Sequence, residues 1–393
     1  MVRFATRACA AIALAAAAFT AASAQPLTPA AAIERLFTEP LDPAWFTPAF
    51  LAQVPPDQIL GLLEDMQAQF GAFTEVEGES GDLVVRLEEV EMDAEVVLDG
   101  EGRFAGLLFG VPVPIGGTVE DFVADVAALP GATSVIVLTN GELAAGHEPE
   151  RVLAVGSAFK LVLLAALDDA VAAGRIAFDD IILLDPALRS IGGGTLEDWP
   201  DNTPLTVATV ANLMISVSDN TATDLLLHLL GRDAAEAISE RNTPFLATAE
   251  LFKLKAAGNE ALRTAWLDGD EAARHRVLDE LAAQPLPDIE AYPIEPMVEP
   301  EWYFNGFEIC ALLDRTAHME AFDINPGIAR EEDWARIAFK GGSEPGVLNL
   351  STLVTAADGT THCVAVTWNS DEVVDEEALI VPYAGILRAL ANP

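Results

Sequence analysis

Apolar positions along the chain change their spacing, and these changes predict where helices and strands lie. Between residues 28 and 70, apolar side chains recur three and four positions apart, which predicts helices. From 72 to 110 the pattern becomes strand-like over three short runs, separated by turn residues at Gly81-Asp82 and at 99–102. Helices followed by a three-stranded antiparallel meander predict a small α+β unit.

A second and larger pattern begins after the segment 111–117, which is rich in proline and glycine and predicts a linker. The Asn140-Gly141 pair further on is a hairpin signal. The expected elements of this part are, in chain order, a helix over 119–129, strands over 134–138 and 143–145, helices from 158 to about 282, strands between 337 and 368, and a closing helix over 383–390. At 393 residues the chain is long enough for two separate cores.

Residues 1–24 have the pattern of a secretory signal peptide. Arg3 and Arg7 precede an alanine-rich apolar run that ends at Phe19, and Ala22-Ser23-Ala24 provides the small residues of a cleavage site. The apolar run is shorter than a membrane-spanning helix requires. We therefore expect cleavage after Ala24, a mature protein that is periplasmic or secreted, and no membrane span.

The charge and the scattered histidines exclude several classes of function. The chain has 62 Asp and Glu against 21 Lys and Arg, a formal net charge of -41, so nucleic acids and anionic membranes would repel it. The five histidines show no metal-ligand spacing, and we expect neither a metal nor another cofactor. Cys310 and Cys363 permit a disulfide in an exported protein, but two separate buried thiols fit the sequence equally well.

Lysine is scarce in this acidic chain, and two of its four lysines stand in short motifs. Ser157 and Lys160 are three residues apart, so on a helix they share a face. A lysine amine kept neutral by burial can take the proton of a serine hydroxyl and so activate it as a nucleophile. Taken alone, this pair is weak evidence for catalysis, since such spacing is common on solvated helices.

Two further motifs follow in the chain. Ser218-Asp219-Asn220 precedes an apolar helix, and each of its residue types also serves as an ordinary helix N-cap. Lys340-Gly341-Gly342-Ser343 by itself is a strand lysine before a turn. In this order the three motifs resemble the S-x-x-K, S-D-N and K-T-G signature of class A β-lactamases and penicillin-binding serine hydrolases. The resemblance covers about residues 118–393.

The resemblance implies a fold and a chemistry for this part of the chain. The fold is a β-lactamase-like α/β/α domain, an antiparallel sheet with a helical subdomain. Ser157 would be the acylated nucleophile, Lys160 its base and Ser218 the proton shuttle to the leaving group. The implied substrate-binding residues are Asn220, Lys340, Gly342 and Ser343. The backbone N–H groups of Ser157 and Ser343 would form the oxyanion hole, and Asp219 would hold its loop together.

The sequence departs from the class A pattern after the second motif. Class A enzymes hydrolyse the acyl-enzyme with a glutamate in an E-x-x-L-N loop, and this loop looks deleted here. Glu250 is interpreted as an ordinary helix residue, and Glu344-Pro345 as a turn. Gly341 replaces the usual hydroxyl residue, which removes one contact to a substrate carboxylate. Tyr303-Phe304-Asn305 matches a Y-x-N motif but is interpreted as a packed helix start.

The two parts of the mature chain, taken together, show a further resemblance. Residues 25–112 resemble the cystatin/NTF2-like fold, and residues 118–393 the hydrolase domain. This combination, with the missing loop, resembles the serine hydrolase group of the clavulanic acid gene cluster, which opens ester side chains of cephalosporins. We therefore expect a secreted serine hydrolase of β-lactams or ester-bearing β-lactam-like small molecules, with weak or ester-biased turnover. The alternatives are a peptidoglycan D,D-peptidase and a non-catalytic penicillin-binding sensor.

Overall fold

The computed structural model describes residues 27–79, 82–288, 292 and 295–392. The chain divides into two compact units, which are described separately. One holds the residues up to Val85 together with Asp93–Phe109, and the other holds Arg86–Met92 together with the chain from Gly110 onward. The predicted signal peptide lies outside the described residues.

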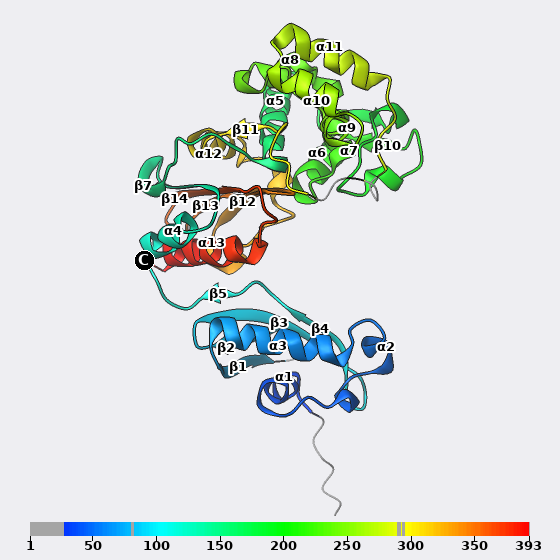
Figure 1. Ribbon diagram of the computed structural model, residues 1–393. Coiled ribbons are helices and arrows are strands. Elements are labelled where there is room, and N and C mark those ends of the chain that lie inside the picture. The colour runs from blue at the N-terminus through cyan, green and yellow to red at the C-terminus, as the bar shows by residue number, and fades with distance from the viewer. Residues whose placement is uncertain (1–26, 80–81, 289–291, 293–294, 393) are drawn as a thin grey trace, which may run out of the picture. The chain divides into compact units, whose positions relative to one another are not determined.

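The first unit consists of helices followed by a sheet (Figure 1). Its elements are α1 (Pro29–Thr38), α2 (Pro48–Leu51), α3 (Pro56–Phe70), β1 (Phe73–Glu79), β4 (Phe104–Phe109), and the larger parts of β2 (Asp82–Leu87) and β3 (Val90–Leu98), whose joining residues Arg86–Met92 belong to the second unit. The strands are ordered β1-β2-β3-β4, and β5 (Val113–Pro114) pairs with the start of β3. The predicted meander had three strands and lacked β1, because Phe73 and Val76, its only large apolar residues, do not alternate with polar ones.

The second unit is built on an antiparallel sheet in the order β12-β13-β14-β6-β7. The strands are β6 (Ala132–Thr139), β7 (Glu142–His147), β12 (Arg336–Glu344), β13 (Val347–Thr355) and β14 (Thr361–Asn369). Since β12 lies at one edge, only one of its sides pairs with another strand of this sheet. The antiparallel sheet that the resemblance implied is confirmed.

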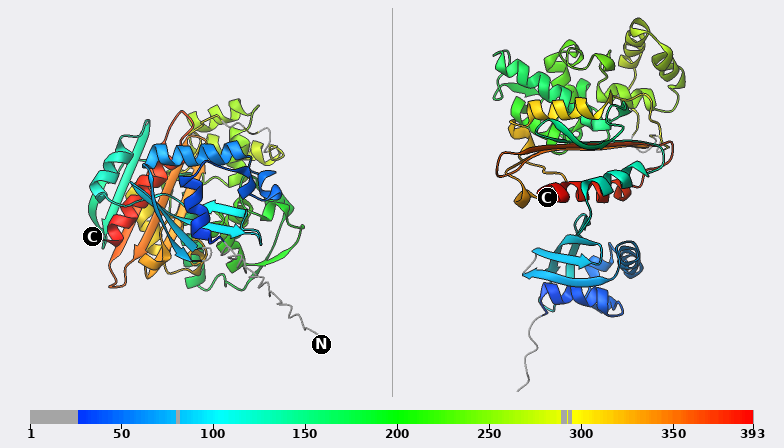
Figure 2. Two further views of the ribbon diagram at one scale, coloured as in Figure 1. Left: turned by 90° about the horizontal axis from the view of Figure 1, so that it is seen from below. Right: turned by 90° about the vertical axis from the view of Figure 1, so that its left-hand side faces the viewer.

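Helices cover both faces of this sheet (Figures 1 and 2). On one face, α4 (Val119–Ala127) and α13 (Glu376–Ala391) pack against apolar residues such as Val364 and Val366. On the other face, α12 (Gly306–Thr316) packs against β14, whose Cys363 forms a disulfide with Cys310 of α12. The predicted last helix began near 383; α13 begins at Glu376, because Asp375 caps it and Pro382 is accommodated within it.

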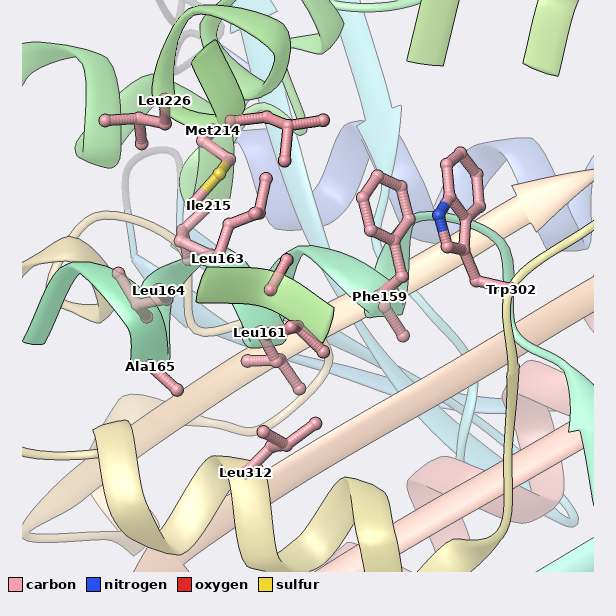
Figure 3. Close-up of a cluster of buried hydrophobic side chains, with 14 of the residues drawn as sticks. Phe159, Leu161, Leu163, Leu164, Ala165, Met214, Ile215, Leu226, Trp302 and Leu312 are labelled. Atoms are coloured by element: carbon pink, nitrogen blue, oxygen red, sulfur yellow. The ribbon is translucent and has the colours of Figure 1, made fainter. Parts of the chain in front are cut away.

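The helical middle packs around α5 (Lys160–Ala172), a helix that is apolar on nearly every side, and its core continues into α12 and one face of the sheet. Figure 3 shows Leu161, Leu163 and Leu164 of α5 together with Met214 and Leu226 of the neighbouring helices. The remaining elements here are α6 (Val207–Ser216), α7 (Asn220–Leu230), α8 (Arg232–Glu236), α9 (Thr248–Lys255), α10 (Glu260–Asp268), α11 (Glu271–Ala282), and the short pairs β8 (Leu153–Ala154) with β11 (Tyr303–Phe304) and β9 (Ile181–Leu183) with β10 (Pro204–Thr206). No helix in the described ranges is long and apolar enough to cross a membrane.

Candidate active site

Ser157 lies in a 3-10 turn, Gly156–Phe159, between strand β8 and helix α5. Asn369 at the end of β14 fixes the approach to this turn, because its side-chain amide exchanges two hydrogen bonds of 2.9 Å with the backbone of Ala154. Behind the turn, the Phe159 ring stacks on Trp302 with 3.6 Å between centroids. The nucleophile that the sequence predicted is thus held on a rigid support, and its own side chain is half-buried.

The Lys160 side chain is completely buried at the start of α5. Its Nζ atom lies 2.5 Å from the Ser218 carbonyl oxygen, 3.0 Å from Ser218 Oγ and 2.7 Å from Asn220 Oδ1. Burial, followed by the positive charge of Lys340, holds the pKa of Lys160 well below its usual value. The neutral amine is therefore more accessible here than on an exposed lysine.

The three oxygen partners of Lys160 can satisfy an ammonium or a neutral amine. A carbonyl and an amide oxygen can only accept, so they take its two hydrogens, whereas the Ser218 hydroxyl can also donate. The lone pair of the amine is then available to receive a proton from a hydroxyl group. No hydrogen bond joins Lys160 to Ser157 in the described part of the chain, and contacts of this kind often tighten only when substrate binds.

Lys340 approaches the same hydroxyl from strand β12. Its Nζ lies 3.1 Å from Ser218 Oγ and 2.5 Å from the Gly341 carbonyl oxygen. Burial lowers the pKa of Lys340 to about 7. The Ser218 hydroxyl thus lies between two buried amines, a position from which it can relay a proton.

The loop that carries Ser218 is shaped by Asp219 and Asn220. Ser218 has a φ of +57°, a conformation that costs energy for a residue with a side chain. The buried Asp219 carboxylate compensates by accepting backbone N–H groups of Thr195 and Leu196 and by capping α7 at Ala222. Asp219 therefore holds the loop together, as predicted.

The backbone of β12 passes very close to the Ser157 turn at Gly342. A Cβ atom built on Gly342 would lie 2.6 Å from the Ser157 nitrogen and 2.1 Å from the Val155 carbonyl oxygen. One built on Gly156, which has a φ of +50°, would lie 3.2 Å from the Ser343 nitrogen. These close approaches place the backbone of β12 at Gly342 and Ser343 directly beside the Ser157 turn, which makes the N–H groups of Ser157 and Ser343 candidates for an oxyanion hole.

Comparison with known proteins relates part of this chain to one family. A model of the beta-lactamase enzyme family matches residues 118–265. That segment is similar to β-lactamases. It contains Ser157, Lys160, Ser218 and Asn220 and ends before Lys340. No curated protein matches the chain.

Several solved structures are similar to the chain at low identity. A β-lactamase from Sphaerobacter thermophilus DSM 20745 is 24% identical, with 69% of this chain and 94% of that chain covered and a TM-score of 0.49. The structure of PBP-A is 17% identical, with 69% and 94% covered and a TM-score of 0.46. An ancestral class A β-lactamase is 21% identical, with 70% and 100% covered and a TM-score of 0.45.

The two glutamates that could be mistaken for a β-lactamase base have other partners. Glu250 pairs with Arg232 at 2.8 Å and accepts the Ala247 N–H, so it closes the first turn of α9 as an ordinary helix residue. Glu344 ends β12 and is followed by the Pro345 turn. Asn305 caps α12, as expected for a packed helix start. In the described ranges, no group of three or more His, Cys, Asp or Glu side chains is placed to hold a metal.

Asp224 is a buried group near the site that sequence reasoning missed. It lies one helical turn after Asn220 on α7, and its two oxygens accept the Thr248 and Ala249 backbone N–H groups at 2.7 and 2.9 Å. Burial raises the pKa of Asp224 to about 6, although these hydrogen bonds oppose the shift. The signal available in the sequence was its four-residue spacing from Asn220, directly before the apolar run Leu225-Leu226-Leu227.

Proposed function

We propose that this protein is an exported serine hydrolase of the β-lactamase-like family that acts through an acyl-enzyme on Ser157. Its substrates are small molecules, either β-lactams or ester-bearing β-lactam-like compounds. The observation that carries the proposal is the Ser218 hydroxyl, which lies within hydrogen-bonding distance of the buried amines of both Lys160 and Lys340. The family match over residues 118–265 supports it.

In the acylation step, Ser157 Oγ attacks the substrate carbonyl carbon while its proton passes to the neutral Lys160 amine. The negative charge that develops on the carbonyl oxygen is stabilised by the N–H groups of Ser157 and Ser343. When the leaving group departs, Ser218 gives it a proton and receives one from the Lys160 ammonium. Lys160 is then neutral again, and the acyl group is bonded to Ser157.

Deacylation is the slower half of the proposed reaction. In place of a loop glutamate, Lys160 or Ser218 would activate the hydrolytic water, which gives weak or ester-biased turnover. The engagement of Glu250 with Arg232 supports this proposal, because it leaves that carboxylate in a structural role. The finer likeness to the clavulanic acid cluster hydrolase, with a cystatin/NTF2-like unit in front, belongs to the same proposal.

The first test mixes the purified protein, and a Ser157→Ala variant, with a cephalosporin that bears an acetyl ester. Intact mass and released products are followed over minutes. Acetate release with the lactam intact, by the native protein alone, is the expected result. A persistent adduct on the native protein, together with D-alanine release from a muropeptide, would favour a D,D-peptidase. No adduct and no product would refute the proposal.

A further inference from the structure

A buried ion cluster lies next to the substrate-binding end of β12, outside the three motifs. Lys255, the last residue of α9, places its Nζ 2.8 Å from Glu301 Oε1 and 3.2 Å from Glu344 Oε2. The side chains of Lys255 and Glu301 are 3% and 0% exposed, and that of Glu344 is 12% exposed. Ions at such depth are retained at a cost in solvation, so their placement calls for an explanation.

Each carboxylate of this cluster is adjacent in sequence to a residue that frames the candidate oxyanion hole. Glu344 directly follows Ser343. Glu301 directly precedes Trp302, whose ring stacks on Phe159. The Trp302 carbonyl oxygen accepts the N–H of Val155, two residues before Ser157, at 3.1 Å. Lys255 therefore connects the strand segment behind one N–H group to the support behind the other.

The charges of the cluster favour attraction between Lys255 and both carboxylates. Lys255 faces both carboxylates, which raise its pKa against the effect of burial, so the ammonium form is retained. One ammonium cannot balance two buried carboxylates, and burial raises the pKa of Glu301. Replacing Glu344 removes the partner that belongs to β12 and leaves Lys255 paired with Glu301, so the remaining cluster is neutral.

We propose that Lys255, Glu301 and Glu344 are positioning residues that hold the Ser343 N–H in place relative to the Ser157 N–H. The cluster touches neither substrate nor the reacting atoms and acts through the backbone on either side of the hole. The inference rests on the proposed function for its kinetic consequence. The fixing of the β12 end by Lys255 is independent of that function.

The matched variants are Glu344→Ala and Glu295→Gln. Glu295 lines the same small cavity as Lys255 and Glu344, but no hydrogen bond joins it to Lys255 within the described residues. Each change removes one carboxylate, and only the first removes a partner of Lys255. Glu344→Gln is a third, conservative variant, which keeps the shape and an acceptor oxygen.

Hydrogen exchange on the full mature chain tests the positioning without reference to activity. We expect faster exchange in the peptide that contains Ser343 for Glu344→Ala, a smaller change for Glu344→Gln and none for Glu295→Gln. The proposed positioning role would be refuted if exchange in Glu344→Ala equalled that of the native protein. It would also be refuted if Glu295→Gln increased exchange by the same amount.

The rate of adduct formation on Ser157 tests the kinetic consequence. For Glu344→Ala, the maximal acylation rate should fall by about 10-fold to 100-fold, the effect of a small misplacement of catalytic groups, while the substrate concentration at half-maximal rate changes little. A change only in that concentration would contradict the inference. Failure of the native protein to form any adduct would refute the proposed function instead. The exchange result would still show whether the cluster positions the Ser343 N–H.

Discussion

Gly342 passes so close to Ser157 that a Cβ on Gly342 would lie 2.6 Å from the Ser157 backbone nitrogen. No side chain fits there without moving the strand or the turn. This close approach places β12, which carries the Ser343 N–H, directly beside the turn that carries the Ser157 N–H, the two donors of the candidate oxyanion hole. The glycine in the third motif is thus a steric requirement of the site.

Gly342→Ala should slow adduct formation on Ser157 by about 10²-fold or more, because the new methyl group displaces one of the two oxyanion donors. Intact mass spectrometry over time measures this rate. Gly341→Ala is the control, since its Cβ would come no closer than 3.1 Å to the Phe339 ring. Equal rates for Gly342→Ala and the native protein would show that this close approach does not place the oxyanion donors.

Ser218→Gly should remove the shared hydroxyl without distorting the loop, because glycine adopts the φ of +57° found at this position at little cost. We expect acylation by a β-lactam to fall by about 10²-fold or more, the usual contribution of a positioned proton donor. An ester should be affected less, because its alkoxide leaving group needs protonation less than an amine does. Stopped-flow acylation with the two substrates makes the comparison, and equal losses would argue against a shuttle role.

Lys340 should make the binding of carboxylate-bearing substrates depend on pH. Its pKa is lowered to about 7 by burial, so the ammonium form predominates below that pH and the neutral amine above it. Only the ammonium attracts a carboxylate, and KM for such a substrate should therefore rise as pH increases from 6 to 8, roughly one unit on each side of that value. The methyl ester of the same substrate is the control. A parallel rise in KM for both compounds would contradict this assignment.

Asp224→Ala should destabilise the helical middle. It leaves one buried and one partly buried N–H group at the start of α9 without their acceptor, which costs roughly 2 kcal/mol or more. Chemical denaturation at pH 7 measures the change in the free energy of unfolding. Asp233→Ala, at an exposed position on α8, serves as the control and should change this free energy little. A similar small change for both variants would show that Asp224 is not needed at the start of α9.

The Cys310–Cys363 disulfide should contribute strongly to stability, because it closes a loop with a sequence separation of 53 residues. The loss of unfolded-state entropy corresponds to about 4 kcal/mol. Reduction with a thiol should lower the melting temperature of the native protein and leave a Cys310→Ala/Cys363→Ala variant unchanged. An unchanged melting temperature of the fully reduced native protein would contradict the prediction.

The local spacing of residues was enough to predict the main elements and the motifs on them. Helical periodicity predicted the helices of the middle region, and turn residues predicted most strands. The pattern failed at β1, where Phe73 and Val76 do not alternate with polar residues, and at the start of α13, which Asp375 caps well before the predicted start near 383. At β1, pairing with β2 determined the structure more than local propensity did, whereas at α13 a local cap was overlooked.

The sequence by itself determined which residues are candidates for serine hydrolase chemistry, since this depends on residue type and short spacing. Only the tertiary structure decided that Lys160 and Lys340 share one hydroxyl, that Cys310 bonds Cys363, and that Lys255 joins Glu344. These partners are far apart in the chain, and no local pattern specifies such a contact. Burial, which lowers the pKa of both site lysines, likewise arises only when the cores close around them.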